Sequence, residues 1–351
     1  MRISSFMYID MMKKSFQDNT SQLFNSQQQL SSGLKINKPS DDISGMGKIL
    51  GYKVDIANSD QFQKNIVSAQ SFLQSSDTAM TSVTDNLQRM QELMVSGVNG
   101  STDTAGRQDI AAEIGTIKES LYALSLSRTG NKYLFSGNLT NAASFASSPQ
   151  SIASSSGFYP YMGDTGQISV NINSTAQVIQ NVTGSDAFAY SITNTFSIRL
   201  TTGNWARFSP SPGGGSSMIN VSLSTSSAPT AQSFEQASFS NYMEMAGIVE
   251  KAFNSNDVDM INAMMDPLQK SMDKVVSVRA TIGARLNLLQ QTQSNNDNNS
   301  VNTQEYLSSV EDSDITKTST DISKSEMALQ ALRQSSGQVM SQTLFDFITI
   351  K

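Results

Sequence analysis

The chain has 351 residues, with 24 Lys and Arg against 30 Asp and Glu, and it contains no Cys and no His. At roughly 150 residues per domain, this length predicts two or three domains and a sizeable core. The absence of Cys and His excludes disulfides, thiolate or imidazole metal ligands, and the nucleophile relays that need either side chain. The net charge of −6 and the lack of a Lys/Arg-rich run argue against nucleic acid as a partner. No apolar run approaches the roughly 20 residues of a membrane helix, so we expect no membrane insertion. Ser4, Ser5 and Asp10 interrupt the apolar region that a signal peptide needs, so we expect no cleaved signal peptide.

The N-terminal segment is typical of a marginal helix. We call the positions that recur every three or four residues, and so share one side of a helix, its seam. In this segment some seam positions carry Asn, Gln or Asp between the apolar ones, so the helix buries little apolar surface by itself. The apolar positions are Ile3, Phe6, Phe16, Leu23 and Leu30.

A sharp turn is expected after this helix. Gly33 favours a helix C-terminus, and Pro39 prevents the helix from continuing. Ser40 is then the candidate N-cap of the next helix, with Asp41 and Asp42 in its first turn, where the helix dipole favours anions.

Three longer apolar seams with alternating spacings of four and three predict heptad helices that pack lengthwise as one rod. Nothing beside the Met-rich seams suggests a ligand, so we interpret them as ordinary core. Gly130-Asn131 are expected to form a left-handed C-cap of the second helix, and Arg279 occupies one seam position of the third. The first seam is Ile66, Ala69, Leu73, Ser76, Met80, Val83, Leu87, Met90 and Met94; the second is Ile110, Ile114, Ile117, Leu121 and Leu124; the third is Ile261, Met264, Leu268, Met272, Val275, Ile282, Leu286 and Leu289.

The stretch between the second and third seams differs in composition. Only four of the 97 residues from Asn138 to Phe234 are charged, and five of the seven prolines of the chain fall here. Short alternating segments, QISVNI (167–172), SIRL (197–200) and MINVSL (218–223), predict strands, with Gly203-Asn204 as a hairpin turn and Trp205 as a core anchor. We expect a β-rich region without helices.

The C-terminal segment again has a thin seam, because Thr318, Ser325 and Ser336 alternate with its apolar positions. We expect both ends, roughly residues 1–35 and 301–351, to lack stable structure in the isolated subunit and to become buried on assembly. The apolar positions are Ile315, Ile322, Leu329, Leu332 and Val339.

Motifs that carry catalytic chemistry are weak here. Gly45, Gly47 and Gly51 give a spacing of GxGxxxG with no strand before it, which is not a dinucleotide loop. Two Ser-x-x-Lys pairs have no companion motifs, and the paired carboxylates fit helix starts better than an acid and base pair. We therefore predict no catalytic residue, no metal and no cofactor.

Residues 30–42, LSSGLKINKPSDD, closely resemble the hallmark of the bacterial flagellin superfamily. Residues 107–137, which end in NKYLFSG, and residues 278–347, which contain IGARLN (282–287) and EDSD (311–314), resemble it as well. The KPSDD and YLFSG segments are more similar to the hook-filament junction branch than to filament flagellins. Ile43 departs from that branch, which often has Pro at this position.

The resemblance implies an α+β fold: a long antiparallel helical bundle or coiled-coil rod formed by the N- and C-terminal segments, with an inserted β-rich domain. The implied regions are 1–38 with 300–351 as terminal assembly helices, 39–137 with 236–299 as the rod, and 138–235 as the insert. It further implies export in an unfolded state with a dedicated chaperone, and a ring of subunits between hook-associated protein 1 and flagellin at the extracellular hook-filament junction. The candidate assembly residues are Ile3, Phe6, Leu23, Leu30, Gly33, Ile36, Asn37, Asp41, Asp42, Arg285, Ile322, Leu329, Leu332 and Val339.

Two alternatives stay open from the sequence. The chain could be a filament flagellin, or it could be a surface-binding module in which the β-rich insert recognises a ligand. Polymerisation of the purified protein separates the first alternative from a junction protein, which should stay monomeric without its partners.

Overall fold

The computed structural model describes residues 2–99, 102–146, 159–190, 196–200, 204–210, 219–224 and 233–348. Within these ranges the chain forms seven helices and eight strands. It divides into two compact units, one made of residues 1–61 and 295–351 and the other of residues 62–294. The α+β class, with a helical bundle from both ends of the chain and strands between them, is confirmed. The boundaries proposed for the three regions stay a prediction.

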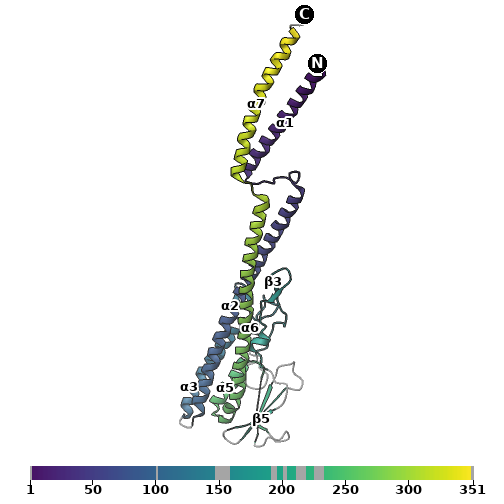
Figure 1. The fold of residues 1–351 in the computed structure, drawn as a ribbon. Helices are drawn as coiled ribbons and strands as arrows, with labels where there is room; N and C mark the ends of the chain where they lie inside the picture. The colour runs from purple at the N-terminus through teal and green to yellow at the C-terminus, as the bar shows by residue number, and fades with distance from the viewer. Residues whose placement is uncertain are drawn as a thin grey trace. The chain divides into compact units, whose positions relative to one another are not determined.

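The first unit contains the two terminal helices, α1 (Arg2–Ser32) and α7 (Ile315–Ile348). They pack along each other and run antiparallel, so the start of α1 and the end of α7 lie at the same end of the pair (Figure 1). The unit also holds the first part of α2 (Ile43–Val98) and the last part of α6 (Val258–Glu311), which contact through the rings of Tyr52 and Tyr306.

Two expectations about the chain ends are wrong. Both ends are helical in the single chain, rather than unstructured before assembly. Leu329 is buried in the single chain, where only 7% of it is exposed, so its burial does not require a neighbouring subunit. The reason is that α1 and α7 cover each other within one chain, and this pairing compensates in part for their thin seams.

The second unit is a bundle of α2, α3 (Thr104–Ser125), α5 (Tyr242–Asn254) and α6. Hydrogen-bonded side-chain pairs show the directions of these helices, because in each pair of helices the residue number rises along one helix as it falls along the other. Helices α2 and α3, α3 and α5, and α2 and α6 are therefore antiparallel. The side-chain pairs are Asn86–Ser120 and Arg89–Glu113, Arg107–Asn256 and Lys118–Glu250, and Gln70–Gln293 and Gln91–Gln269.

The predicted seams form the core of this bundle. Every residue of the first seam is fully buried, including Ser76. The second and third seams are buried or packed against the same core, which confirms the heptad interpretation. The structure adds α5, which the sequence did not indicate; its first two turns, from Tyr242 to Val249, are buried all round.

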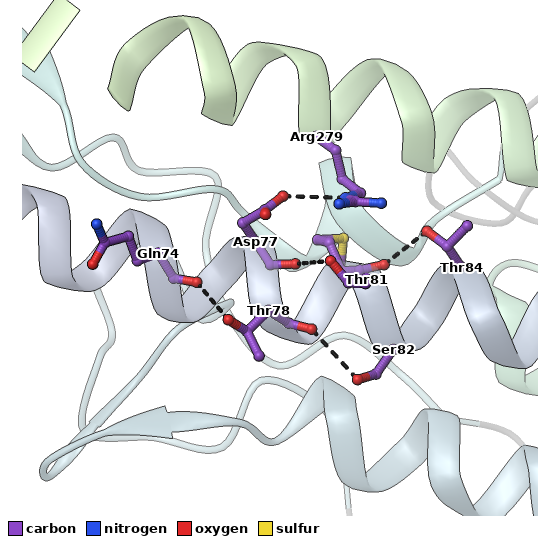
Figure 2. Close-up of polar contacts among 8 residues, drawn as sticks. Gln74, Asp77, Thr78, Thr81, Ser82, Thr84 and Arg279 are labelled. Atoms are coloured by element: carbon purple, nitrogen blue, oxygen red, sulfur yellow. Dashed lines mark hydrogen bonds and ion pairs between the residues drawn. The ribbon is translucent and has the colours of Figure 1, made fainter. Parts of the chain in front are cut away.

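The hydroxyl groups of the Ser/Thr-rich segment of α2 bond within the helix itself. The side chains of Thr78, Thr81 and Thr84 each donate to the carbonyl oxygen four residues earlier, at 2.8–3.0 Å (Figure 2). Such bonds satisfy the hydroxyls without a tertiary partner. Arg279, at its seam position on α6, donates from Nε to Asp77 Oδ1 of α2 at 3.1 Å.

The end of α3 differs from the prediction. The helix stops at Ser125, and Leu126 is its C-cap. Gly130, with φ +58°, forms instead the turn of a small hairpin between β1 (Arg128–Thr129) and β2 (Lys132–Tyr133). A residue in the left-handed conformation suits a tight hairpin as well as a helix C-cap. The prediction of a left-handed turn at Gly130 was therefore correct, but its assignment to the end of the helix was wrong.

The inserted region contains two antiparallel sheets. One pairs β3 (Ser169–Asn171) with β4 (Gln177–Ile179). The other is a four-stranded meander of β5 (Phe196–Arg199), β6 (Trp205–Pro210), β7 (Ile219–Ser224) and β8 (Ser233–Phe239). The three predicted strand segments coincide with β3, β5 and β7. Gly203 and the side chain of Trp205 lie outside the described part of the chain.

The insert is not free of helices, because α4 (Gly184–Phe188) forms one short turn capped by Thr183. Phe188 of this turn packs edge-on against Phe135 at 5.1 Å between ring centroids, and it lies 6.2 Å from the ring of Tyr242. The buried residues of the insert and of the helices therefore belong to one continuous core.

Candidate assembly junction

The resemblance motif at residues 30–42 forms the turn between α1 and α2. Gly33 has φ +73°, and its N–H donates to Gln29 O at 2.9 Å, which ends α1 in the left-handed conformation that glycine favours. Asn37 Nδ2 then donates to Leu34 O at 3.0 Å, and Gln29 Nε2 to Lys35 O at 3.0 Å. The turn is therefore held by its own polar side chains.

The two adjacent aspartates have different tasks. Asp41 Oδ2 accepts from the N–H groups of Asn37 and Lys38, at 3.1 and 3.0 Å, and closes the turn. Asp42 Oδ1 accepts from the N–H groups of Ser44 and Gly45, both at 3.0 Å.

The assignment of Ser40 as the N-cap is therefore wrong. Helix α2 begins at Ile43, so Asp42, the residue before it, is the cap. The physical reason is that Asp41 holds the preceding backbone in a turn, which leaves Ser40 too early to reach a free helical N–H. Gly45 completes the arrangement, because a Cβ there would lie 2.5 Å from Cδ1 of the buried Ile36.

The C-terminal turn between α6 and α7 is tied directly to this N-terminal turn. Leu34 and Asp312 form an antiparallel β-bridge. Lys35 N–H donates to Glu311 O at 2.6 Å, and Ser313 N–H donates to Gly33 O at 2.9 Å. We call this pair of turns, residues 33–42 and 311–314, the junction.

Charged side chains of the C-terminal turn strengthen the junction. The buried carboxylate of Glu311 accepts from Lys53 Nζ at 2.6 Å, which links α6 to α2. Asp314 Oδ1 accepts from Lys317 N–H at 3.0 Å and caps α7. Sequence reasoning noted the EDSD segment but not its backbone pairing with Leu34 and Lys35, for which no local sequence signal exists.

A polar cavity of about 420 Å³ lies beside the N-terminal turn. Its walls come from the end of α1 and from the turn itself, and they consist mainly of amides and the two aspartates. The lining residues are Asn25, Gln28, Gln29, Lys35, Ile36, Asn37, Asp41 and Asp42. The junction therefore brings together four candidate residues, Ile36, Asn37, Asp41 and Asp42, beside Gly33.

The other candidate residues lie apart from the junction. On α1, Leu23 is half-buried and Leu30 is 42% exposed; on α7, Ile322 and Leu332 are half-buried. Ile3, Phe6 and Val339 belong to these helices, but their side chains lie outside the described part of the structure. Arg285 is in the second unit, where it lines a different cavity.

The seam of the terminal pair is polar, as the sequence indicated. Thr318 and Ser325 of α7 and Ser26 of α1 are buried. Large apolar side chains point outward instead, including Phe24 and Met327, each 62% exposed. In a single chain, this pair thus leaves apolar surface in contact with water.

The carboxylates of the junction are engaged within the chain. Asp41, Asp42 and Asp314 accept from backbone N–H groups, Glu311 accepts from Lys53, and Asp312 accepts from the hydroxyl of Ser308. Among the described residues, no group of three or more Asp and Glu side chains is placed to hold a metal ion. Over the same residues, no helix is long and apolar enough to cross a membrane. What the geometry can do is couple α1 and α7 to α2 and α6 through two crossed turns.

The terminal helices tied by paired turns belong to a chain whose residues 3–140 match the bacterial flagellin N-terminal helical region. The resemblance to the flagellin superfamily is confirmed over this part of the chain. Flagellin of Listeria innocua is 32% identical over 36% of this chain, and the match covers 44% of that flagellin, less than half of its length.

Within the superfamily, the similarity to flagellar hook-associated protein 3 extends over nearly the whole chain. The protein of Salmonella typhimurium is 23% identical over 98% of this chain and 99% of its own length. The crystal structure of the flagellar junction protein FlgL from Legionella pneumophila superposes with a TM-score of 0.53 at 17% identity, covering 75% of this chain and 100% of that chain. This last likeness supports the fold.

Proposed function

We propose that this chain is a structural component of the bacterial flagellum that joins the hook to the filament. The observation that carries the proposal is the end-to-end similarity to hook-associated protein 3, over 98% of this chain and 99% of the relative. The similarity to the flagellin of Listeria innocua covers 36% of the chain. A filament subunit is therefore the weaker reading, and we assign no catalytic activity.

In this proposal the terminal pair α1 and α7 is the surface that meets other subunits. Its outward apolar side chains, such as Phe24 and Met327, support this role, because large exposed apolar groups on a helix are typical of surfaces that become covered. The partners would be further copies of this chain in a ring, hook-associated protein 1 on one side and flagellin on the other. The candidate assembly residues remain those named from the sequence.

The junction would transmit force between the terminal pair and the rest of the chain. Its two backbone hydrogen bonds between residues 33–35 and 311–313, together with the Lys53–Glu311 ion pair, support this role. A turn held by one chain segment alone would pivot more freely than one crossed by a second segment.

Assembly at the extracellular hook-filament junction requires export, and we propose that the chain is exported unfolded. A chain without Cys needs no disulfide rearrangement on the way. A chaperone that holds α7 before export would cover the apolar side chains that later meet other subunits.

The location is tested by electron microscopy of intact flagella carrying labelled protein. We expect label at one ring at the base of each filament. Label along the filament would instead indicate a flagellin, and so would polymerisation of the purified protein onto filament seeds.

The assembly surface is tested by Leu30→Asp, which places a charge at an exposed apolar position of α1. The matched control is Gln27→Asp, which adds the same charge at an exposed polar position of the same helix. We expect both variants to fold and to be secreted equally, and only Leu30→Asp to abolish motility. Equal motility of the two variants, at equal secretion, would remove this side of α1 from the assembly surface.

A further inference from the structure

A second cavity, of about 260 Å³, lies within the second unit between α6 and the segment of residues 167–186. The α6 wall is a single stripe of the helix, since its residues follow at intervals of three, one, three and four. These residues are Lys274, Ser277, Val278, Thr281 and Arg285. The opposite wall is partly apolar, with Ile179 and Val182, and partly polar.

The charge of this cavity is opposite to that of the chain. Two cations, Lys274 and Arg285, line it together with one carboxylate, that of Asp186. With all three groups ionised the cavity carries one excess positive charge, whereas the chain as a whole carries −6. A concave site whose lining carries a net charge of one sign attracts ions of the opposite sign.

Neutral carbonyl oxygens hold both cations in place. Lys274 Nζ donates to Ala189 O at 2.8 Å, and Arg285 Nη1 donates to Asn181 O at 2.9 Å. The carboxylate of Asp186 accepts from Thr183 Oγ1 at 2.8 Å. The cations are thus positioned by the backbone, and each keeps further N–H donors, because an ammonium has three and a guanidinium five.

Burial acts on both cations more strongly than the nearby carboxylate does. Loss of hydration lowers the pKa of Lys274, and the attraction of Asp186 only partly opposes this effect. Loss of hydration likewise lowers the pKa of Arg285, and the attraction of Asp186 again opposes this effect only in part. The protein alone leaves part of the free-energy cost of desolvating the two cations uncompensated. A bound anion would offset that part.

We propose that this cavity binds a small hydroxylated monocarboxylate of the chemical class of uronic acids. One carboxylate brings the charge of the cavity to zero, whereas a phosphate dianion exceeds it. The planar fork of Arg285 matches a carboxylate in two parallel hydrogen bonds, and Lys274, about three turns away along α6, adds to the positive potential of the cavity. Gln167 and Ser277 of the lining offer polar groups for the hydroxyls, and the apolar wall suits the C–H face of the ring.

The test is a titration of the full-length chain, labelled at its Ile and Val methyl groups, with D-glucuronate. We expect saturable NMR shifts at Ile179, Val182 and Val278 and none at methyls outside the cavity. D-glucose, which has the hydroxyls without the carboxylate, should give no saturable shift. Inorganic phosphate should bind more weakly than glucuronate.

Charge-removing variants test the residues themselves. Lys274→Gln and Arg285→Gln should each weaken glucuronate binding by about tenfold or more, because each removes one of the two positive charges of the cavity. Lys270→Gln, on the same helix but outside the cavity lining, should leave binding unchanged.

Several results overturn the proposal: no saturable shift with glucuronate, equal shifts with glucose, tighter binding of phosphate, or equal weakening by Lys270→Gln. If a Gln variant fails to fold, as judged by its thermal melt, the position of the wild-type shifts still decides. Shifts confined to the cavity methyls support the site, and shifts elsewhere refute it.

Discussion

The division of tasks between Asp41 and Asp42 gives a sharp prediction. Asp42→Ala removes the N-cap of α2, a loss that costs about 1 kcal/mol of unfolding free energy. Asp41→Ala removes two hydrogen bonds to backbone N–H groups, each worth about 0.5–1.5 kcal/mol. Because both carboxylates are exposed, water replaces part of what is lost, and we expect about 1 kcal/mol for each variant.

The assay is amide hydrogen exchange measured residue by residue, because the two variants should act on different amides. Asp41→Ala should speed exchange at Asn37 and Lys38, and Asp42→Ala at Ser44 and Gly45. A loss of about 1 kcal/mol in local opening free energy corresponds to about fivefold faster exchange.

Asp41→Asn and Asp42→Asn are the matched controls. Each carboxylate uses a single oxygen for both bonds, and asparagine keeps one acceptor oxygen of the same geometry. We therefore expect the Asn variants to behave almost as the wild type. If Asn and Ala variants are equally damaging, or if the two Ala variants affect the same amides, the separate tasks assigned here are refuted.

Three further predictions concern the second unit. Phe188→Ala, which removes a fully buried ring beside Tyr242, should cost about 3–5 kcal/mol and lower the melting temperature of the helices followed by circular dichroism; unchanged helix melting would show that the insert has a core of its own. Arg279→Leu should leave unfolding free energy unchanged or higher, since a half-exposed ion pair with Asp77 is worth less than about 1 kcal/mol and the position belongs to an apolar seam; a loss above about 2 kcal/mol in denaturant titration would contradict this. Burial raises the pKa of Glu244 above its ordinary value of 4.5, so the folded state holds the proton more tightly, and this group's contribution to stability is fully present below pH 4.5 and lost as the pH rises through the raised value. Relative to Glu244→Gln, the wild type should therefore lose melting temperature as the pH rises from 4 to 7, and a difference that does not vary with pH would contradict the assignment.

The long seams were predictable because they depend on one local property. A residue at every third or fourth position faces the same side of a helix, and in α2 that side is fully buried over nine seam positions from Ile66 to Met94. No knowledge of the neighbouring helices is needed to detect such a pattern. Strands β3, β5 and β7 of the insert were predictable for a similar reason, since their residues alternate with a period of two, whereas β4, β6 and β8 were not predicted.

Helix α5 is too short to show a sustained seam. Its first two turns are buried on every side, and apolar or small residues occupy every position there except that of Glu244. It is also only 13 residues long, which a buried strand and its flanks could equally occupy. Periodicity detects helices at the edge of a core and misses short ones inside it.

The start of α2 could not be predicted for a different reason. Ser40, Asp41 and Asp42 are all good N-cap residues, and nothing local ranks them. The choice depends on contacts that form only in the folded turn, because Asp41 accepts from the N–H groups of Asn37 and Lys38 and leaves Asp42 as the cap. The junction as a whole depends on the bridge between Leu34 and Asp312, which lie far apart in sequence, and only the resemblance motif indicated its place.

The terminal pair shows why composition alone misjudged its state. The thin seam was taken to mean too little burial for a stable helix, yet α1 and α7 pair within one chain. The buried side of this pair combines Leu329 with the hydroxyl groups of Ser26, Thr318 and Ser325, whereas Phe24 and Met327 are exposed. Scattered exposed apolar residues are ordinary, but here they accompany an interior that contains three buried hydroxyl groups. That combination favours a pair whose apolar contacts are completed by other chains.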